Sequence, residues 1–110
     1  MNMQLSTTLL PLLAAALFIA TSPAQAADGE AIVKKARCVA CHAVDQKRVG
    51  PAYKDVAAKY KGDTGVSAKL FDKVREGGGG NWGDTPMIPH PSSVISDFEL
   101  KAAIEWILDL

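Results

Sequence analysis

Two cysteines and a histidine stand together in the segment Cys38-Val39-Ala40-Cys41-His42. This is the pattern C-x-x-C-H, in which two thiols can form thioether bonds with the vinyl groups of a haem. A histidine directly after the second thiol is then held beneath the iron, where an imidazole nitrogen can coordinate it. The segment therefore predicts one covalently attached haem c, bound through Cys38 and Cys41, with His42 as an axial ligand of the iron.

Two other chemistries use a C-x-x-C pair. A structural zinc site needs four closely spaced ligands, whereas this chain has only two cysteines and its second histidine, His90, lies far downstream. A thioredoxin-type redox pair opens a helix after a strand, and no alternating strand pattern precedes Cys38. We therefore favour haem attachment over zinc binding or thiol redox chemistry.

The N-terminus has the pattern of an export signal. The apolar run at residues 9–20 is shorter than the roughly 20 residues that a membrane span needs, and small residues follow it at Ala24-Gln25-Ala26. These features predict a cleavable secretory signal peptide over residues 1–26, although no lysine or arginine precedes the apolar run. An uncleaved anchor is the alternative, and Pro11 and Pro23 disfavour it because they interrupt or end the run.

Removal of 26 of the 110 residues would leave 84, at residues 27–110, which is one small domain. A chain of this length buries a modest core and usually needs an additional stabilising element. A covalently held haem can be that element, because it offers a large apolar body against which helices can pack. Export fits this chemistry, since a cysteine pair without haem would be oxidised in an extracytoplasmic compartment.

Charge is balanced overall but unevenly placed. All 12 basic and 12 acidic side chains lie after residue 26, so the mature domain is formally neutral, which argues against a nucleic-acid partner. Residues 34–61 nevertheless carry a basic surplus of eight residues against two: Lys34, Lys35, Arg37, Lys47, Arg48, Lys54, Lys59 and Lys61 against Asp45 and Asp55. The surplus is either a basic rim that steers an acidic partner or an ordinary solvated surface.

The rest of the chain has the periodicity of helices joined by loops. We expect helices over residues 29–37, from Tyr53 until Gly62, and over residues 66–76, each with an apolar face. No segment alternates with period two, so the predicted fold class is all-α.

A last helix has the clearest signals. Ser96-x-x-Glu99 predicts a capping box, and Ile95 can pack against Leu100 as a hydrophobic staple. The helix that follows carries one apolar stripe, which we expect to pack across the first helix.

The loop over residues 77–91 decides the second iron ligand. Its four consecutive glycines lack the Gly-Lys-Ser/Thr sequence and the preceding strand of a phosphate loop, so they favour a backbone that lies close over a flat ligand. Met87, the only methionine after residue 26, stands between prolines in this loop. Its thioether can be the sixth ligand of the iron, whereas a methionine that only fills the core is the alternative.

Five segments of the chain, taken together, resemble a known family. They are Cys38–His42, Val49–Lys59, Trp82-Gly83, Pro86-Met87 and the C-terminal helix with Trp106. They are similar to the small class I bacterial cytochromes c of the cytochrome c-551/c-552 (c8) type. The resemblance implies a single-domain class I cytochrome c fold of about four short helices around one haem c, with His42 and Met87 as axial ligands.

The resemblance also implies roles for residues beside the haem. Trp82 matches a tryptophan whose indole N–H donates to a haem propionate, with a plain core aromatic as the alternative. Pro51 matches a proline whose segment orients the proximal histidine, His42. Lys73 stands where related chains often carry an arginine, and it can neutralise a propionate without a bidentate fork.

His90 departs from the family pattern. Related chains commonly carry an asparagine there, which donates a hydrogen bond near the methionine sulfur. His90 can donate similarly, but it can also titrate. We therefore hypothesise that the midpoint potential depends on pH through His90; a solvent-exposed loop histidine is the alternative.

In function, the resemblance implies a monomeric, periplasmic one-electron carrier of a respiratory chain, and not an enzyme. Donors to such proteins include membrane quinol-oxidising complexes and other cytochromes, and acceptors include cytochrome cd1 nitrite reductase, terminal oxidases and peroxidases. No membrane span would remain after signal cleavage. If Met87 does not bind iron, a five-coordinate haem sensor or a weak peroxidase is the alternative, and His90 in its place would make a bis-histidine cytochrome.

Overall fold

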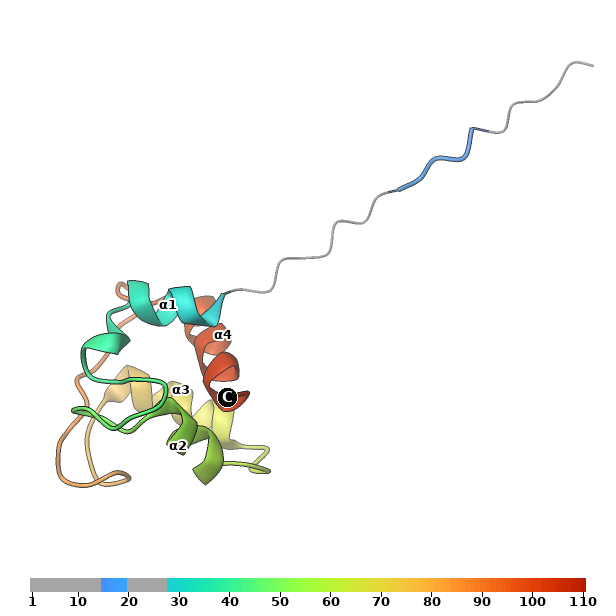
Figure 1. Cartoon of the computed structure of the whole chain (residues 1–110). Coiled ribbons are helices and arrows are strands. Elements are labelled where there is room, and N and C mark those ends of the chain that lie inside the picture. The colour runs from blue at the N-terminus through green and yellow to red at the C-terminus, as the bar shows by residue number, and fades with distance from the viewer. Residues whose placement is uncertain (1–14, 20–27) are drawn as a thin grey trace, which may run out of the picture.

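The computed structural model of the chain describes residues 15–19 and 28–110. The predicted cleavage site and most of the predicted signal peptide lie outside these ranges. The described chain forms five elements (Figure 1): helix α1 (Gly29–Lys35), the 3-10 turn η1 (Cys38–Ala40) and helices α2 (Tyr53–Lys59), α3 (Val66–Glu76) and α4 (Asp97–Leu108). Within the same ranges no β-strand forms, and the only bridge joins Gly78 to Met87. The all-α class is therefore confirmed.

None of the helices in the described ranges combines the length and apolar character needed to cross a membrane.

Helix α1 begins as predicted but ends early. The carboxylate of Asp28 accepts a hydrogen bond from the Ala31 N–H at 3.1 Å, which caps the first turn. The predicted helix ran to Arg37, whereas α1 stops at Lys35 because Arg37 adopts a left-handed conformation with φ of 64°. A helix cannot continue through that conformation, and the chain turns at once into η1.

Helix α4 carries the predicted capping box. The Ser96 hydroxyl accepts from the Glu99 N–H at 3.2 Å, and the Glu99 carboxylate accepts from the Ser96 N–H at 3.1 Å. Lys35 of α1 also donates to this carboxylate, at 2.7 Å. The Lys35 contact first, and the Ser96 N–H second, lower the pKa of Glu99 below its ordinary value.

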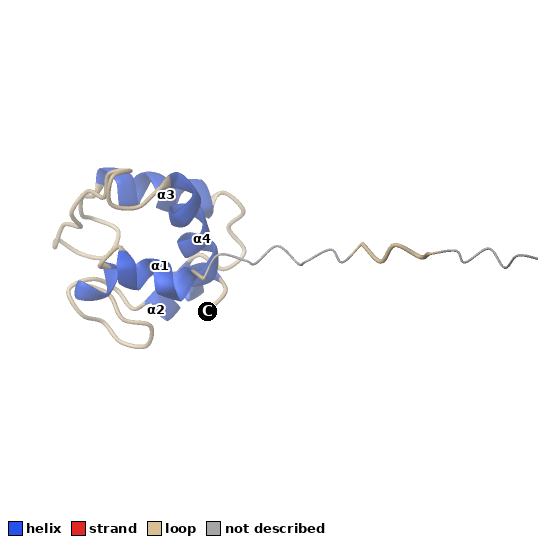
Figure 2. Cartoon of the chain, turned by 90° about the horizontal axis from the view of Figure 1, so that it is seen from above, coloured by secondary structure: helices blue, strands red, loops and turns tan. Residues whose placement is uncertain are grey.

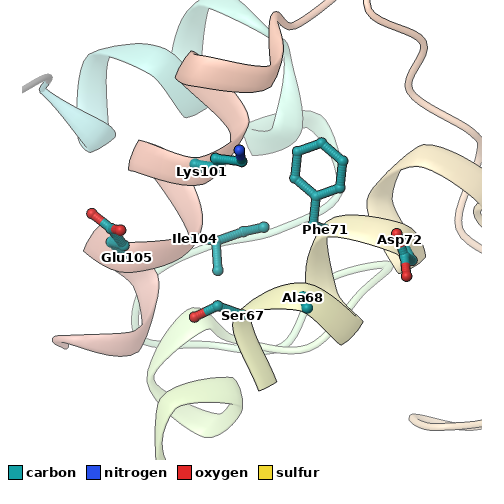
Figure 3. Close-up of a pocket in the computed structure, with 7 residues that line it drawn as sticks. All are labelled: Ser67, Ala68, Phe71, Asp72, Lys101, Ile104 and Glu105. Atoms are coloured by element: carbon teal, nitrogen blue, oxygen red, sulfur yellow. The ribbon is translucent and has the colours of Figure 1, made fainter. Parts of the chain in front are cut away.

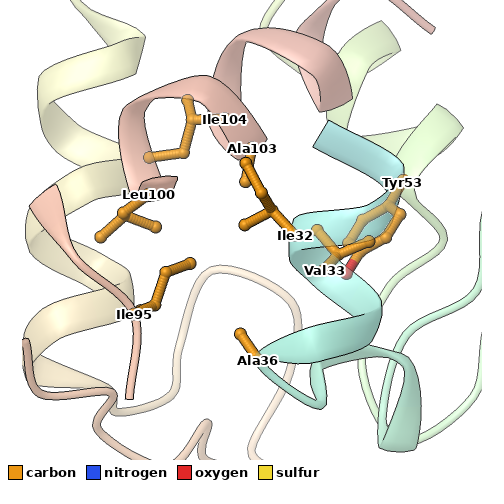
Figure 4. Close-up of a cluster of buried hydrophobic side chains, with 8 residues drawn as sticks. All are labelled: Ile32, Val33, Ala36, Tyr53, Ile95, Leu100, Ala103 and Ile104. Atoms are coloured by element: carbon orange, nitrogen blue, oxygen red, sulfur yellow. The ribbon is translucent and has the colours of Figure 1, made fainter. Parts of the chain in front are cut away.

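The core lies where α4 crosses α1 (Figure 4). Its buried side chains form one cluster: Ile32, Val33, Ala36, Tyr53, Ile95, Leu100, Ala103 and Ile104. The predicted packing of the last helix across the first is thus confirmed. The crossing is close at Gly29, where a Cβ atom would lie 2.2 Å from the Cβ of Trp106.

Two long connections lie on one side of this helical core. The segment between η1 and α2 and the segment between α3 and α4 emerge on the same side in both views (Figures 1 and 2). The first connection follows the C-x-x-C-H motif and the second contains Met87. The fold therefore places the two predicted iron-ligand segments on one side.

We predict that Gly29→Ala destabilises the protein, because its methyl group must displace Trp106 from the α1–α4 crossing. Overpacking of this kind costs about 1–3 kcal/mol, which urea unfolding of the haem-loaded protein would measure. The matched control is Gly65→Ala, where the nearest atom to an added Cβ lies 3.6 Å away and φ is −93°. Equal losses of stability in the two variants would contradict the argument.

We also predict an acid-sensitive contribution from the α4 cap. Because the Glu99 pKa is lowered on folding, its carboxylate stabilises the fold above the ordinary value of 4.5, and this contribution disappears as pH falls through the lowered pKa. Glu99→Gln should therefore be less stable than the natural protein at pH 7, with the difference shrinking at pH 3. The control is Glu105→Gln, which removes a carboxylate from the same helix away from the cap. A difference that is independent of pH would refute this account.

Candidate haem-binding site

The C-x-x-C-H motif folds as one tight turn. The N–H groups of Cys41 and His42 both donate to the Cys38 carbonyl, at 3.1 and 3.0 Å. Cys38 and Cys41 are free thiols, and both are half-buried. Burial raises the pKa of the Cys38 thiol above its ordinary value. The turn thus holds two thiols and an imidazole within five residues.

The His42 ring is fixed by a backbone carbonyl. Its Nδ1 lies 2.8 Å from the Pro51 carbonyl oxygen. Because a carbonyl only accepts, Nδ1 carries the proton, and Nε2 keeps its lone pair as a potential metal ligand. The family resemblance implied that the segment around Pro51 orients His42, and the contact is made by the carbonyl of Pro51.

Two further residues bound the same ring. A Cβ atom on Gly50 would lie 2.4 Å from the Cε1 atom of His42, so only glycine lets the backbone come this close. The Tyr53 ring stacks on the imidazole, with centroids 5.3 Å apart and planes 15° from parallel. Burial raises the pKa of the Tyr53 hydroxyl, which keeps this neighbour neutral.

Met87 is tied to the glycine segment that follows α3. Its N–H donates to the Gly78 carbonyl at 3.0 Å, and the Gly78 N–H donates to the Met87 carbonyl at 2.9 Å. A Cβ atom on Gly77, where φ is 70°, would lie 2.5 Å from the Met87 oxygen. The glycines therefore bring two backbone segments together around a half-buried methionine.

Trp82 and Pro51 line one hollow of about 410 Å³ between the two long connections. Its other lining residues are Lys47, Arg48, Val49, Gly50, Asp55 and Thr85. Lys59 of α2 contacts Trp82 at one side of this hollow. Its ammonium lies 4.3 Å from the Trp82 ring centroid and donates to the Asn81 carbonyl at 2.9 Å.

Lys73 and His90 contact the backbone of the Met87 loop. The Lys73 ammonium donates to the Gly79 carbonyl at 3.3 Å. The His90 ring places Nδ1 2.8 Å from the Ile88 carbonyl, and the His90 N–H donates to the Val74 carbonyl at 2.9 Å. Both side chains therefore lie at the loop that carries the predicted ligand.

A second hollow, of about 340 Å³, lies between α3 and α4 (Figure 3). It is lined by Ser67, Ala68, Phe71, Asp72, Lys101, Ile104 and Glu105, and contains none of the predicted site residues.

Four residues contact the candidate site although the sequence did not assign them a role there: Gly50, Tyr53, Lys59 and Arg75. Gly50 had a usable signal, because a glycine before a proline marks a sharp break near a predicted ligand. Tyr53 had the periodicity of a core residue, and it is buried. Its contact with His42 is a tertiary contact that no local pattern predicts.

The residues present fit a covalently bound haem. Two free thiols stand at the spacing that thioether attachment requires. The imidazole beside them is held in the tautomer that leaves Nε2 available. A thioether lies in a glycine-rich loop on the same side of the core.

Comparison with known proteins identifies the same family that the sequence resembles. The model of the cytochrome c family matches residues 26–110. Cytochrome c-551 of Pseudomonas aeruginosa is 46% identical over 100 residues, which cover 91% of this chain and 92% of that protein. Cytochrome c-551 of Azotobacter vinelandii is 46% identical over 80 residues, covering 73% and 94%.

A solved structure agrees with these relatives. The crystal structure of wild-type Nitrosomonas europaea cytochrome c552 superimposes with a TM-score of 0.67 at 44% identity, over 74% of this chain and 98% of that one. The chain therefore belongs to the cytochrome c family, in its small class I c-551/c-552 group, and binds one covalently attached haem c.

Proposed function

We propose that this protein is an exported one-electron carrier in which His42 and Met87 are the axial ligands of the haem iron. The observation that carries the proposal is the hydrogen bond from His42 Nδ1 to the Pro51 carbonyl at 2.8 Å. That contact fixes one nitrogen and leaves the other for the metal. Met87, whose loop is tethered at Gly78, would supply the second ligand.

The chain's own residues keep the site rigid in both redox states. Cys38 and Cys41 would hold the haem through thioether bonds, and Gly50 and Tyr53 hold the proximal ring. The bridge from Gly78 limits how far Met87 can move. When bound between a histidine and a methionine, the haem supplies one-electron chemistry with both axial positions filled.

Three further roles remain within this proposal. Trp82 would donate its indole N–H to a propionate, Lys73 would help to neutralise a propionate, and Pro51 orients His42 through its carbonyl. Trp82 and Pro51 line the same hollow, so their two segments lie beside one another.

The protein would work in the periplasm. The predicted signal peptide over residues 1–26 supports export. The monomeric carrier would take electrons from a quinol-oxidising complex or another cytochrome. It would pass them to a nitrite reductase, a terminal oxidase or a peroxidase.

The basic surplus near the motif offers a surface for these encounters. Three of its eight members face carboxylates in ion pairs, namely Lys34, Lys35 and Lys54. Arg37, Lys47 and Arg48 flank the haem-attachment turn in sequence and are exposed. These three would attract an acidic partner to the haem edge through long-range charge, in a small and transient contact.

We predict that the purified protein shows the spectrum of His/Met ligation. The ferric form should have the weak near-red band of a sulfur-to-iron bond, and the ferrous form should not respond to carbon monoxide, because no axial position is open. Met87→Ala should lose the near-red band and bind carbon monoxide. The control is Met87→His, which should lose the band but remain closed to carbon monoxide.

Rapid carbon monoxide binding by the natural protein would overturn the carrier proposal in favour of a sensor or a peroxidase. A closed iron without the sulfur band would instead indicate bis-histidine ligation, with His90 as the candidate.

We also predict that the midpoint potential falls as pH rises from 5 to 8. Histidine can carry a positive charge that asparagine cannot, and a positive charge in the Met87 loop would favour the ferrous state. The guanidinium of Arg75, which donates to the His90 carbonyl, stays charged throughout and does not contribute a slope. His90→Asn should flatten the dependence. Parallel slopes in the two proteins would reject the role of His90.

A further inference from the structure

Arg75, in the last turn of α3, makes an unusual set of contacts. Its NH1 group donates to two backbone carbonyls, at 2.9 Å to His90 and at 2.8 Å to Ile95. Its NH2 group pairs with the carboxylate of Asp97, the first residue of α4. One side chain therefore joins the end of α3, the Met87 loop and the start of α4.

The Arg75 side chain is largely removed from water. Its exposed fraction is 17%, whereas the lysines in the other ion pairs of the described chain are 57% exposed or more. Its guanidinium lies over the Phe71 ring, 5.1 Å from the centroid. A charge in this position stabilises the structure only when its hydrogen bonds are satisfied, and its removal leaves the acceptors unpaired.

The backbone of His90 is held on both sides of its Cα atom, through two adjacent peptide groups. The His90 N–H donates to the Val74 carbonyl at 2.9 Å, and the His90 carbonyl accepts from Arg75. This attachment lies three residues after Met87, while the bridge to Gly78 holds Met87 itself. Ile88 between them is 69% exposed, so apolar packing does little to hold this part of the loop.

Arginine is the side chain that this geometry requires. The three acceptors lie around one planar fork, and two separate nitrogen atoms serve them. A lysine has a single donor nitrogen on a flexible stem and cannot reach the same three groups while stacking on Phe71.

We propose that Arg75 is a positioning residue for the iron ligand Met87. By joining the His90 carbonyl to the start of α4, it keeps the loop from opening and so keeps the thioether at the iron. The inference rests on the proposed function, since it takes Met87 to be an axial ligand.

The test measures how fast the loop opens. Imidazole displaces the thioether only when the loop moves away, so the loss of the near-red ferric band with saturating imidazole reports opening. Arg75→Met should accelerate this loss by about tenfold or more, as expected when a charged hydrogen-bond donor is removed. Arg75→Lys keeps one charged donor nitrogen but cannot serve three acceptors, so it should accelerate the loss by a smaller factor. Asp97→Asn keeps both carbonyl contacts and should produce a smaller acceleration, above about twofold.

Two controls separate loop anchoring from general stability. Lys101→Met removes the other cation near the Phe71 ring, at 5.9 Å, and should leave the rate unchanged. Figure 3 shows Phe71 on α3 and Lys101 on the facing helix α4. Ser96→Ala weakens the α4 cap without removing a loop contact, so it should lower stability while leaving the rate near that of the natural protein.

Hydrogen exchange of the His90 amide gives a second readout, which is independent of the iron. Exchange should be faster in the Arg75 variants and in Asp97→Asn than in Lys101→Met. If the Arg75 variants match Lys101→Met in both measurements, or Ser96→Ala opens as fast as they do, the inference is overturned. If the natural protein lacks the ferric sulfur band, the proposed function fails together with the inference. Where the Arg75 variants do not fold, Asp97→Asn decides by the same comparison.

Discussion

The orientation of one imidazole is the constraint on which the candidate site depends. Residue 42 follows Cys41 directly, so covalent attachment fixes where the ring is rooted but not how it is turned. The carbonyl of Pro51 removes that freedom by accepting from Nδ1 at 2.8 Å. Proline suits this position because its fixed φ stiffens the segment that presents the carbonyl. Gly50, just before it, lets the backbone approach the ring closely.

The same constraint reaches the helical core through an aromatic contact chain. Tyr53 stacks on His42 and also meets Trp106 edge to face, with centroids 5.9 Å apart and planes at 81°. Trp106 in turn lies against Gly29 at the α1–α4 crossing. Tyr53, which stacks on His42, therefore belongs to the core that holds the helices together. Such sharing suits a small domain, in which a bound haem and a modest core must stabilise one another.

Sequence patterns correctly predicted the features that depend on neighbouring residues. Helix α3 begins and ends where its apolar pattern and Gly77 indicated, and the Ser96–Glu99 capping box forms as predicted. The end of α1 was missed because the left-handed turn at Arg37 serves the motif that follows, and arginine has no local preference for it. The role of Arg75 was not predictable either. Its partners lie 15 to 22 residues downstream, and two of them are backbone carbonyls, which residues of every type provide.

A loop rich in glycine and proline creates a problem that these long-range contacts solve. Glycines lack the side chains that could anchor the loop, so the described structure holds it by its carbonyl groups instead. Lys59, Lys73 and Arg75 each reach from a helix to one of them, at Asn81, Gly79 and His90. Charged donors form stronger hydrogen bonds than neutral ones. The hydrogen bond from the arginine is partly buried, whereas those from the two lysines are exposed to water. The loop that carries Met87 is therefore held by cations of α2 and α3 as well as by its own residues.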